Sequence, residues 1–557
     1  MGNLARVLIG NTFVTGALLF AAAEMWAQKP PQARVDSVFT AFDRKDSPGC
    51  ALGVYQDDRI VYARGYGMAD LQAGLPITSQ SVFDIGSTSK QFTAASIVLL
   101  AQQGKLSLDD DVRRYIPELP LYSKPITIRH LLHHTSGLRD YIGLMTWGGA
   151  SIDDHTTAQQ ALAAIVRQKG LNFEPGAEYL YSNSGYFLLS QIVERVSGKS
   201  LRTFAQEQIF EPLGMKSTHF HDDHRMVVPN RAIGYEPTSA GFEIAMSRWE
   251  QTGDGAVHTT VEDLLLWDRN FYQPKVGGAP MLTTLLTSGL LNSGDTLDYA
   301  LGLVHETFRG LKAVSHGGSW AGYRAELVRF PEQHFSVATL CNLASANPSQ
   351  LARSVAEIYL ADKMTTAALP KAAGAARISV PATTLSAWTG DYRNPVTGTP
   401  RVVSMEGEKL LASFGPTRQE MIPTGANEFT VLIDSNVLRL VLERGSNGER
   451  RMRQFLNGRQ TAVFEEVHFV QPTAAELEAR IGEYFSEELQ ATFKLTHEGA
   501  GLVLHGAARV PIQLRALATG DFVSGPWSLK FARDAQGHVA GFLLSAGRVR
   551  GITFTRK

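Results

Sequence analysis

The chain has 557 residues and a formal net charge of −1, with 44% hydrophobic and 19% charged residues. This length predicts several domains rather than one core. The near-zero net charge excludes the basic stripe of a nucleic-acid-binding protein and also an acidic tail. The composition is that of an ordinary globular protein.

The N-terminal segment has the three-part pattern of a secretory signal. Arg6 precedes an apolar run over residues 7–23, and small residues lead to an exit at Ala27. The run is short for a membrane span. We expect residues 1–27 to be a cleaved signal peptide and the mature protein to be periplasmic or secreted, without stable membrane insertion. The alternative is an uncleaved signal that anchors the chain in the inner membrane.

The next segments predict one α+β domain over residues 28–364. Residues 47–71 have the alternation of two strands, and residues 312–344 contain three further strand patterns. Between them, residues 87–198 and 261–272 have mainly helical periodicity. Strands at both ends with helices between them favour a sheet that joins the first and last segments.

The last third contains two copies of one small β-module, residues 381–468 and 469–557, after an Ala- and Pro-rich linker at 365–380. At an offset of 92 residues, equivalent positions match: Gly390 and Gly482, Tyr392 and Tyr484, Gly407 and Gly499, Leu410 and Leu502. Short alternating strands with Gly and Asn turns favour closed or nearly closed barrels.

The chain has only two cysteines, Cys50 and Cys341, which excludes a disulfide framework and a cysteine-based zinc site. They fall on the expected first and last strands of the α+β domain, which should be neighbours. A cross-strand disulfide between them is conceivable after export, but its geometry is uncommon. We expect two buried free thiols.

The stretch "GSTSK" places Ser87 and Lys90 at the mouth of an apolar helix. Residues three apart share a helix face, so a desolvated lysine can accept the proton of the serine hydroxyl. The helix N-terminus would favour a developing oxyanion. The pattern alone is weak, because ordinary capping of a core helix also produces it.

Two other stretches offer complementary chemistry. In "YSN", Tyr181 can relay a proton if nearby cations lower its pKa, and Asn183 can hold a substrate amide. The alternative is a packed tyrosine with Asn183 as a helix N-cap. In "HGGS", residues 316–319, the paired glycines permit close approach of a substrate, and the amides of Ser319 and Ser87 can form an oxyanion hole. The alternative is a strand-terminal turn with an exposed histidine.

The ordered motifs S-x-x-K, Y-x-N and H-x-G resemble the serine β-lactamase and penicillin-recognising superfamily, in its class C β-lactamase-like branch of D-aminopeptidases, D,D-carboxypeptidases and esterases. The resemblance covers about residues 35–362 and includes "LLHHTSGLRDY" at 131–141 and "GDGAVHTTVEDLLLW" at 253–267. It implies an α+β catalytic domain, an antiparallel sheet with an all-helical lobe, followed here by two tandem all-β barrel domains.

The resemblance also implies roles for the motif residues. Ser87 would be the acylated nucleophile, and Lys90 would be its base or the group that orients the base. Tyr181 would carry the proton to the leaving group and activate the deacylating water. The resemblance leaves the proton acceptor open between Lys90 and Tyr181. Asn183 would contact the substrate amide. The substrate-binding strand would be His316, Gly317, Gly318 and Ser319.

Two departures from the β-lactamase pattern bear on the substrate. His316 stands where many β-lactamases carry a lysine, and a histidine is mostly uncharged at neutral pH. Gly317 lacks the hydroxyl of the corresponding threonine. We therefore expect an exported serine hydrolase that acts on D-amino-acid-containing peptides or amides. The alternatives are an esterase, a weak class C-type β-lactamase, or a penicillin-binding protein that acylates without efficient turnover.

Other features remain open at this stage. The barrel modules resemble those that restrict the active site in D-aminopeptidases, although a spacing or surface-binding role fits equally. The segment "THFHDDH" at 218–224 could bind a metal, but a solvated turn is more typical, and the family's chemistry needs neither metal nor cofactor. Trp320 and Tyr323 either line an apolar subsite or pack beneath the strand. His133 and His134 should stabilise the periphery of the site.

Overall fold

The computed structural model describes residues 31–365, 378–433, 436–456, 458–506 and 510–557. The predicted signal peptide, residues 1–27, and most of the predicted linker lie outside these ranges. Within them, no helix is both long enough and apolar enough to cross a membrane.

The first domain is built on a six-stranded antiparallel sheet with the order β10-β11-β12-β13-β1-β2. The strands are β1 (Cys50–Gln56), β2 (Arg59–Tyr66), β10 (Val304–Phe308), β11 (Leu311–Trp320), β12 (Tyr323–Phe330) and β13 (Phe335–Cys341). The first strand pairs with the last, so the predicted α+β architecture is confirmed.

Alternation along β1 explains how the sheet is covered on both faces. Leu52 and Val54 pack in the core that contains Val355 of α11 (Pro348–Tyr359), beside α1 (Pro31–Val38). Their neighbours Ala51 and Tyr55 point into the larger core that the sheet shares with the helical lobe and α9 (Val261–Asn270). Successive strand residues face opposite sides, which fixes this division.

The helical lobe surrounds α2 (Lys90–Gln102), in which eleven of thirteen residues are buried. A helix that is apolar around most of its circumference belongs at the centre of a domain. The other helices of the lobe are α3 (Ile128–Leu132), α4 (Tyr141–Trp147), α5 (Ala158–Val166), α6 (Asn183–Ser197), α7 (Leu201–Ala205), α8 (Glu211–Leu213) and α10 (Gly278–Leu285).

Several short strands lie outside the main sheet. A three-stranded sheet has the order β5-β9-β6, and two hairpins pair β3 with β4 and β7 with β8. Their bounds are β3 (Met68–Asp70), β4 (Leu75–Pro76), β5 (Phe83–Asp84), β6 (His219–Phe220), β7 (Tyr235–Thr238), β8 (Gly241–Ile244) and β9 (Val257–Thr259).

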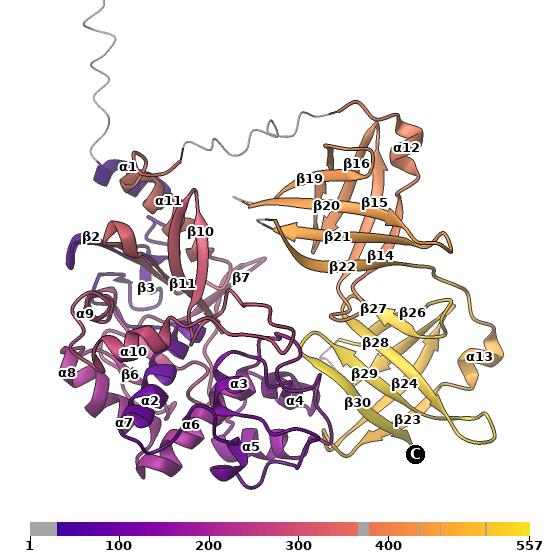
Figure 1. Cartoon of the computed structure of the whole chain (residues 1–557), viewed down its shortest axis with the longest axis horizontal. Coiled ribbons are helices and arrows are strands. Elements are labelled where there is room, and N and C mark those ends of the chain that lie inside the picture. Colours follow the sequence, from indigo (N-terminus) through magenta and orange to yellow (C-terminus); the bar gives the residue numbers. More distant parts are fainter. Residues whose placement is uncertain (1–30, 366–377, 434–435, 457, 507–509) are drawn as a thin grey trace, which may run out of the picture.

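The two predicted barrels are confirmed (Figure 1). The first is a nine-stranded sheet introduced by α12 (Ala382–Ser386), with the strands β14 (Gly390–Arg393), β15 (Pro400–Glu406), β16 (Lys409–Phe414), β17 (Thr417–Glu420), β18 (Ile422–Pro423), β19 (Glu428–Ile433), β20 (Asn436–Arg444), β21 (Arg450–Leu456) and β22 (Arg459–Val467). The second is a closed barrel introduced by α13 (Ala474–Glu478), with the strands β23 (Gly482–Ser486), β24 (Ala491–Glu498), β25 (Gly501–His505), β26 (Ile512–Ala516), β27 (Phe522–Ser524), β28 (Trp527–Arg533), β29 (Val539–Ala546) and β30 (Val549–Arg556).

The internal repeat has an equivalent hydrogen bond in each copy. Tyr392 donates its hydroxyl proton to the carbonyl of Trp388 at 2.9 Å, and Tyr484 donates to the carbonyl of Arg480 at 2.7 Å. Both tyrosines are buried, and each bond ties the first strand of its barrel to the helix before it. The repeated sequence therefore encodes a repeated helix-to-strand corner.

The expectation of two free thiols is wrong, because Cys50 and Cys341 form a disulfide. The two residues are directly opposite each other in the antiparallel pair of β1 and β13, with Cα atoms 4.0 Å apart. Both side chains are fully buried. The register of the two strands thus brings the sulfurs together.

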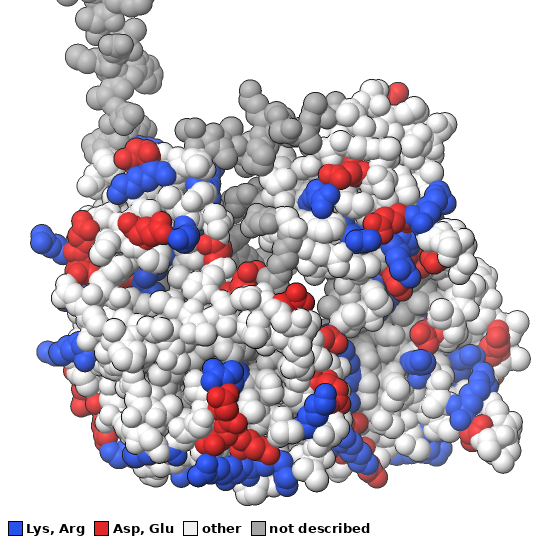
Figure 2. Space-filling view, in the orientation of Figure 1, with Lys and Arg blue, Asp and Glu red and all other residues white. Residues whose placement is uncertain are grey.

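Acidic and basic side chains lie interspersed on the face that Figure 2 shows, in keeping with the near-zero net charge. The last barrel lies beside the helical lobe, next to α4 (Figure 1). Aromatic packing contributes to this contact, since the rings of Trp147 in α4 and Trp527 in β28 are 4.9 Å apart.

Candidate active site

The structure brings Ser87 and Lys90 together at the start of the central helix. Ser87 lies in the 3₁₀ turn Gly86–Ser89, and Lys90 begins α2 directly after it. The Lys90 ammonium nitrogen is 3.1 Å from the Ser87 hydroxyl oxygen. The predicted pair is therefore within hydrogen-bond reach.

The environment of Lys90 favours its neutral form. The side chain is fully buried, and burial lowers the pKa of Lys90 from its ordinary value to about 7. The nearby carboxyls of Asp254 and Asp140 limit this fall, while Arg548 adds to it. Burial likewise raises the pKa of Asp254. At neutral pH, Lys90 is therefore less positive and Asp254 less negative than an exposed lysine and an exposed aspartate would be.

Lys90 also makes two other hydrogen bonds that fix its position. Its Nζ donates to Asn183 Oδ1 at 3.0 Å and to the Asp254 carbonyl at 2.5 Å. Asn183 is the first residue of α6, and Ser182 holds the N-cap position, so the alternative of Asn183 as a cap is wrong. Asn183 donates its backbone amide and Nδ2 to Asp140 Oδ2 at 2.8 Å and 3.0 Å.

Tyr181 lies next to this pair, in the loop before α6. Lys90 Nζ is 4.8 Å from the centre of its ring, and the His134 ring packs against it at 4.1 Å. The Tyr181 hydroxyl is buried and makes no hydrogen bond of ordinary geometry within the described part of the chain, but the Ser87 side chain lies close enough to influence its pKa.

The pKa of Tyr181 does not follow the expectation that cations would lower it. Burial raises this pKa well above its ordinary value, and the opposing effects of Ser87 and Arg548 are smaller. Tyr181 is thus a neutral phenol at pH 7. Of the two candidate proton acceptors, only Lys90 has a pKa near neutrality.

His316 lies on β11 and is buried, so the alternative of an exposed turn histidine is wrong. Its Nδ1 donates to the carbonyl of Gly317 at 2.6 Å, which leaves Nε2 to accept from the Tyr299 hydroxyl at 3.1 Å. Burial and the Lys90 charge lower the pKa of His316 to about 4. His316 is therefore uncharged at neutral pH, as the sequence predicts.

The glycines of β11 allow the strand to pack against the serine turn. A Cβ atom on Gly318 would lie 1.8 Å from the carbonyl oxygen of Ile85, and one on Gly86 would lie 2.6 Å from the Ser319 amide nitrogen. The close approach at Gly318 is thus to the protein's own backbone rather than to a substrate. The same packing brings the Ser87 amide nitrogen within 3.1 Å of a Cβ atom on Gly318, so the amides of Ser87 and Ser319 lie close to each other.

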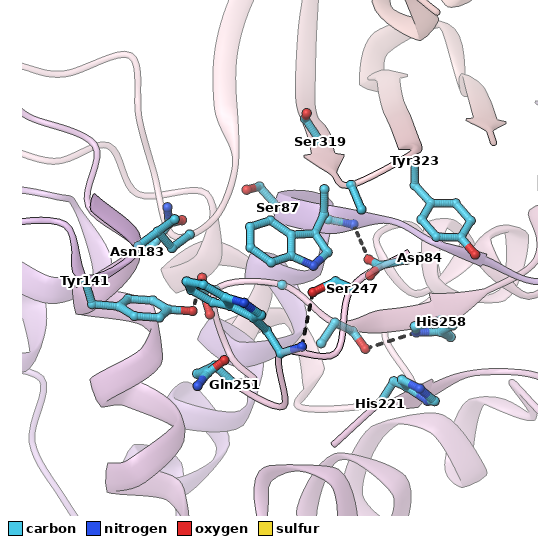
Figure 3. Close-up of a pocket in the computed structure, with 18 of the residues that line it drawn as sticks. Asp84, Ser87, Tyr141, Asn183, His221, Ser247, Gln251, His258, Ser319 and Tyr323 are labelled. Atoms are coloured by element: carbon cyan, nitrogen blue, oxygen red, sulfur yellow. Dashed lines mark hydrogen bonds between the residues drawn. The ribbon is translucent and has the colours of Figure 1, made fainter. Parts of the chain in front are cut away.

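A pocket extends from Ser87 along the small β5-β9-β6 sheet (Figure 3). Trp320 and Tyr323 both line it, which favours the subsite interpretation, and Tyr323 also donates to the carbonyl of Ala232 at 2.5 Å. The lining includes Asp84, Ser87, Tyr141, Asn183, His221, Arg231, Trp249, Asp254, His258, Ser319, Trp320 and Tyr323.

A hairpin of the last barrel reaches this site. The guanidinium carbon of Arg548, at the turn between β29 and β30, is 4.6 Å from the centre of the Tyr181 ring. One of its nitrogens lies 3.8 Å from Asp140 Oδ2, and its carbonyl accepts from Asn172 Nδ2 at 2.9 Å. Sequence reasoning missed Asp140, Asp254 and Arg548, although the first two lie in stretches that carry the family resemblance.

Comparison with known proteins agrees with this geometry. The family model described as Beta-lactamase matches residues 35–361. Penicillin-binding protein 4* of Bacillus subtilis is 31% identical over 391 residues, covering 66% of this chain and 85% of that protein. A D-aminopeptidase of Brucella anthropi is 26% identical over 539 residues, covering 91% and 95% of the two chains.

Among solved structures, the octameric penicillin-binding protein homologue from Pyrococcus abyssi aligns with a TM-score of 0.55 and 23% identity, over 78% of this chain and 99% of that one. This likeness supports the fold. The family match covers the segment that carries Ser87, Lys90, Tyr181 and His316. This match and the two relatives identify the chain as a serine hydrolase that belongs to the β-lactamase family.

Proposed function

We propose that this protein hydrolyses D-amino-acid-containing peptides or amides through an acyl-enzyme on Ser87. The observation that carries the proposal is the 3.1 Å contact between the Ser87 hydroxyl and a buried lysine whose pKa is about 7. A neutral amine at that distance can take the hydroxyl proton as the oxygen attacks a carbonyl carbon. The substrate is then a small peptide, amide or ester.

The remaining groups have roles that follow from their positions. The amides of Ser87 and Ser319 would stabilise the oxyanion of the tetrahedral intermediate. Tyr181, a neutral phenol, would donate its proton to the leaving amine and recover one from the Lys90 ammonium, which holds the proton taken from Ser87. It would afterwards orient the deacylating water. Asn183 and Asp140 position Lys90, since Asn183 bridges the lysine to the Asp140 carboxylate.

Two observations favour D-amino-acid substrates over β-lactams. The D-aminopeptidase relative aligns over 91% of the chain, so its match extends beyond the catalytic domain into the barrel modules. His316 is neutral, and its two ring nitrogens already bond to the Gly317 carbonyl and the Tyr299 hydroxyl. This strand therefore offers no permanent positive charge to a β-lactam carboxylate.

We propose that the last barrel restricts what enters the site. Its hairpin holds Arg548 over Tyr181, and Val549 lies so close to α4 that a Cβ atom on Gly143 would be 2.8 Å from it. We assign residues 28–364 to the catalytic domain, with the modules at 381–468 and 469–557. Export after cleavage of residues 1–27 completes the proposal.

A second candidate activity is D,D-carboxypeptidase, because Arg548 supplies a cation beside Tyr181. About half of its side chain is exposed, and the carboxylate of Asp140 lies 3.8 Å away, beyond ordinary hydrogen-bond distance. Arginine recognises carboxylates through its planar fork of donors. Arg548→Ala should then lower kcat/KM for an acyl-D-Ala-D-Ala peptide more than for D-Ala p-nitroanilide.

The test is intact-protein mass spectrometry together with turnover on four substrates: D-Ala p-nitroanilide, an acyl-D-Ala-D-Ala peptide, nitrocefin and p-nitrophenyl butyrate. We expect an adduct on Ser87, the highest kcat/KM for one of the D-alanine substrates, and little turnover of L-Ala p-nitroanilide. Ser87→Ala should lower kcat by at least about 10⁴-fold, as loss of a serine nucleophile does elsewhere.

Ser89→Ala is the matched control, since this neighbouring serine is also buried and its hydroxyl accepts from the Val257 amide at 3.0 Å. It should retain the adduct. The proposal fails if Ser87→Ala is as active as the wild type on every substrate. Fast turnover of the butyrate ester with none of either D-alanine substrate would instead support the esterase alternative.

A further inference from the structure

Three histidines converge on one face of the small sheet beside the catalytic pocket. His219 of β6 is directly opposite His258 of β9 in their antiparallel register. His221 continues the ladder by donating its amide to the Ala256 carbonyl at 2.7 Å. Opposite residues, and residues two apart on a strand, point to the same face. The backbone therefore holds all three imidazoles together.

The spacing of the ring nitrogens fits a metal ion. One nitrogen of each ring lies within 4.8 Å of the others, and His219 Nε2 is 3.3 Å from His221 Nδ1. Two nitrogens bound tetrahedrally to zinc at about 2.0–2.1 Å are about 3.3–3.4 Å apart. The pair already has the separation of two ligands of one ion.

His258 supplies the second, independent observation. Its Nδ1 faces the Ala256 carbonyl at 3.4 Å and must donate there, so Nε2 carries a lone pair. This Nε2 atom is buried and has no hydrogen-bond partner among the residues that the structure describes, and 1% of the residue is exposed. A buried acceptor without a partner is costly unless something binds it.

A hydrogen-bond chain without metal accounts for only part of this arrangement. Arg231 Nη1 is 3.5 Å from His221 Nε2, so the arginine can donate to that ring and His221 Nδ1 can donate to His219. Such a chain still leaves His258 Nε2 without a partner. Metal binding through His221 Nδ1 would place the proton on Nε2, which could then no longer accept from Arg231.

The charges around the cluster define which ligand fits. Burial lowers the pKa of His219 to about 4 and that of His221 to about 3, and it also lowers that of His258, so all three rings are neutral. Neutral imidazole is the form that binds metals. Arg202 is paired with Asp222 at 2.9 Å. Arg231 faces the Asp84 carboxyl, since burial raises the pKa of Asp84 and the Arg231 charge opposes this rise.

We propose that His219, His221 and His258 bind one divalent transition-metal ion of the Zn²⁺ class in the wall of the pocket that Ser87 lines. His221 and His258 lie side by side at the end of this pocket, away from Tyr141 and Asn183 (Figure 3). Three protein ligands leave a fourth position open toward the pocket, for water or for an anionic group of a substrate. The proposal does not depend on acylation of Ser87.

A second group, His155, His224 and Glu250, provides an internal comparison. There the Glu250 carboxylate already pairs with both rings, at 3.0 Å to His155 and 2.7 Å to His224, and the His155 side chain is half exposed. These groups satisfy one another without a metal. His224→Gln is thus a matched control for the buried cluster.

The test uses the full chain without residues 1–27 and without a histidine tag. Titration with Zn²⁺ by calorimetry should give one site, and Co²⁺ should give the visible spectrum of a tetrahedral nitrogen-ligated ion. His219→Gln and His258→Gln should weaken Zn²⁺ binding by more than about 100-fold, since loss of an outer-shell partner alone costs about 10–100-fold. His224→Gln and Ser87→Ala should leave the affinity unchanged.

His219 is half-buried, so His219→Gln should disturb folding less than replacement of either of the two buried histidines. An unchanged midpoint of thermal unfolding, measured in the presence of a chelator, confirms that this variant is folded. The proposal is overturned by three results: no binding to the wild type, equal affinity in His219→Gln, or loss of binding in His224→Gln alone. Because Ser87→Ala retains all three histidines, failure of this site and failure of the hydrolase proposal give different results.

Discussion

Replacing Glu488 should release the last barrel from the helical lobe. Its carboxylate is the counter-ion of Arg139 at 2.5 Å, and their side chains are 3% and 5% exposed. Arg139 in turn donates to the carbonyls of Arg550 and Gly551 on the hairpin, at 2.8 Å and 3.0 Å. Glu488 also accepts the Lys169 amide at 2.9 Å. The pair therefore fastens the hairpin that carries Arg548.

The size of the effect follows from burial. Glu488→Ala would leave the Arg139 guanidinium buried without its partner, which costs about 3–5 kcal/mol. This cost should change the docking equilibrium constant of the barrel by roughly 10²- to 5 × 10³-fold. Glu487→Ala is the matched control: Glu487 also pairs across the interface, with Lys169, but both side chains are about two-thirds exposed. Such an exposed pair contributes little to docking, because solvent screens the two charges.

Two measurements test this prediction. Hydrogen exchange of the β30 amides should accelerate in Glu488→Ala and stay near the wild-type rate in Glu487→Ala. The ratio of kcat/KM for a long D-alanyl peptide to that for D-Ala p-nitroanilide should rise in Glu488→Ala only. Equal effects of the two variants would refute the energetic reasoning, and faster exchange with an unchanged kcat/KM ratio would refute restriction by the hairpin.

Three further predictions concern the site and the sheet. Lys90 accepts a proton only as the neutral amine, so kcat/KM should fall as pH drops through about 7, and a pH–rate profile that stays flat on both sides of that value would contradict this. Arg548→Met should move that acid limb to higher pH, because the guanidinium lowers the Lys90 pKa, and an unmoved limb would argue against this coupling. Joint replacement of Cys50 and Cys341 by alanine should reduce the free energy of unfolding by about 2–4 kcal/mol relative to the oxidised wild type, measured by calorimetry, and an equal free energy in the two proteins would contradict this.

Features with a local signal were predictable from the sequence. Ser87 and Lys90 are three residues apart on one helical face, so their contact follows from helix geometry as soon as the helix is assigned. The barrels were predictable because the repeat preserves Tyr392 and Tyr484 at equivalent corners. The pairing of the first and last segments in one sheet followed from the order of strand and helix patterns, and its antiparallel arrangement from the family resemblance.

Features that depend on tertiary packing were not predictable. The direction of the Tyr181 pKa shift depends on burial, which only the packed lobe supplies. The disulfide required the register of β1 and β13, because a shift of one residue would point the two side chains to opposite faces. Arg548 reaches Tyr181 only because a distant barrel docks on the lobe, and no short-range pattern encodes that contact.

The position of positive charge connects these observations. His316 occupies the place of a lysine in the related β-lactamases, and its hydrogen bonds and burial keep it neutral. The cation beside Tyr181 comes instead from Arg548, whose charge does not change at physiological pH. Because Arg139 and Glu488 hold its hairpin, the charge exists at the site only while the last barrel is docked. If both proposals hold, recognition of a substrate carboxylate and exclusion of bulky substrates would be two consequences of one docking equilibrium, and Glu488→Ala should alter both together.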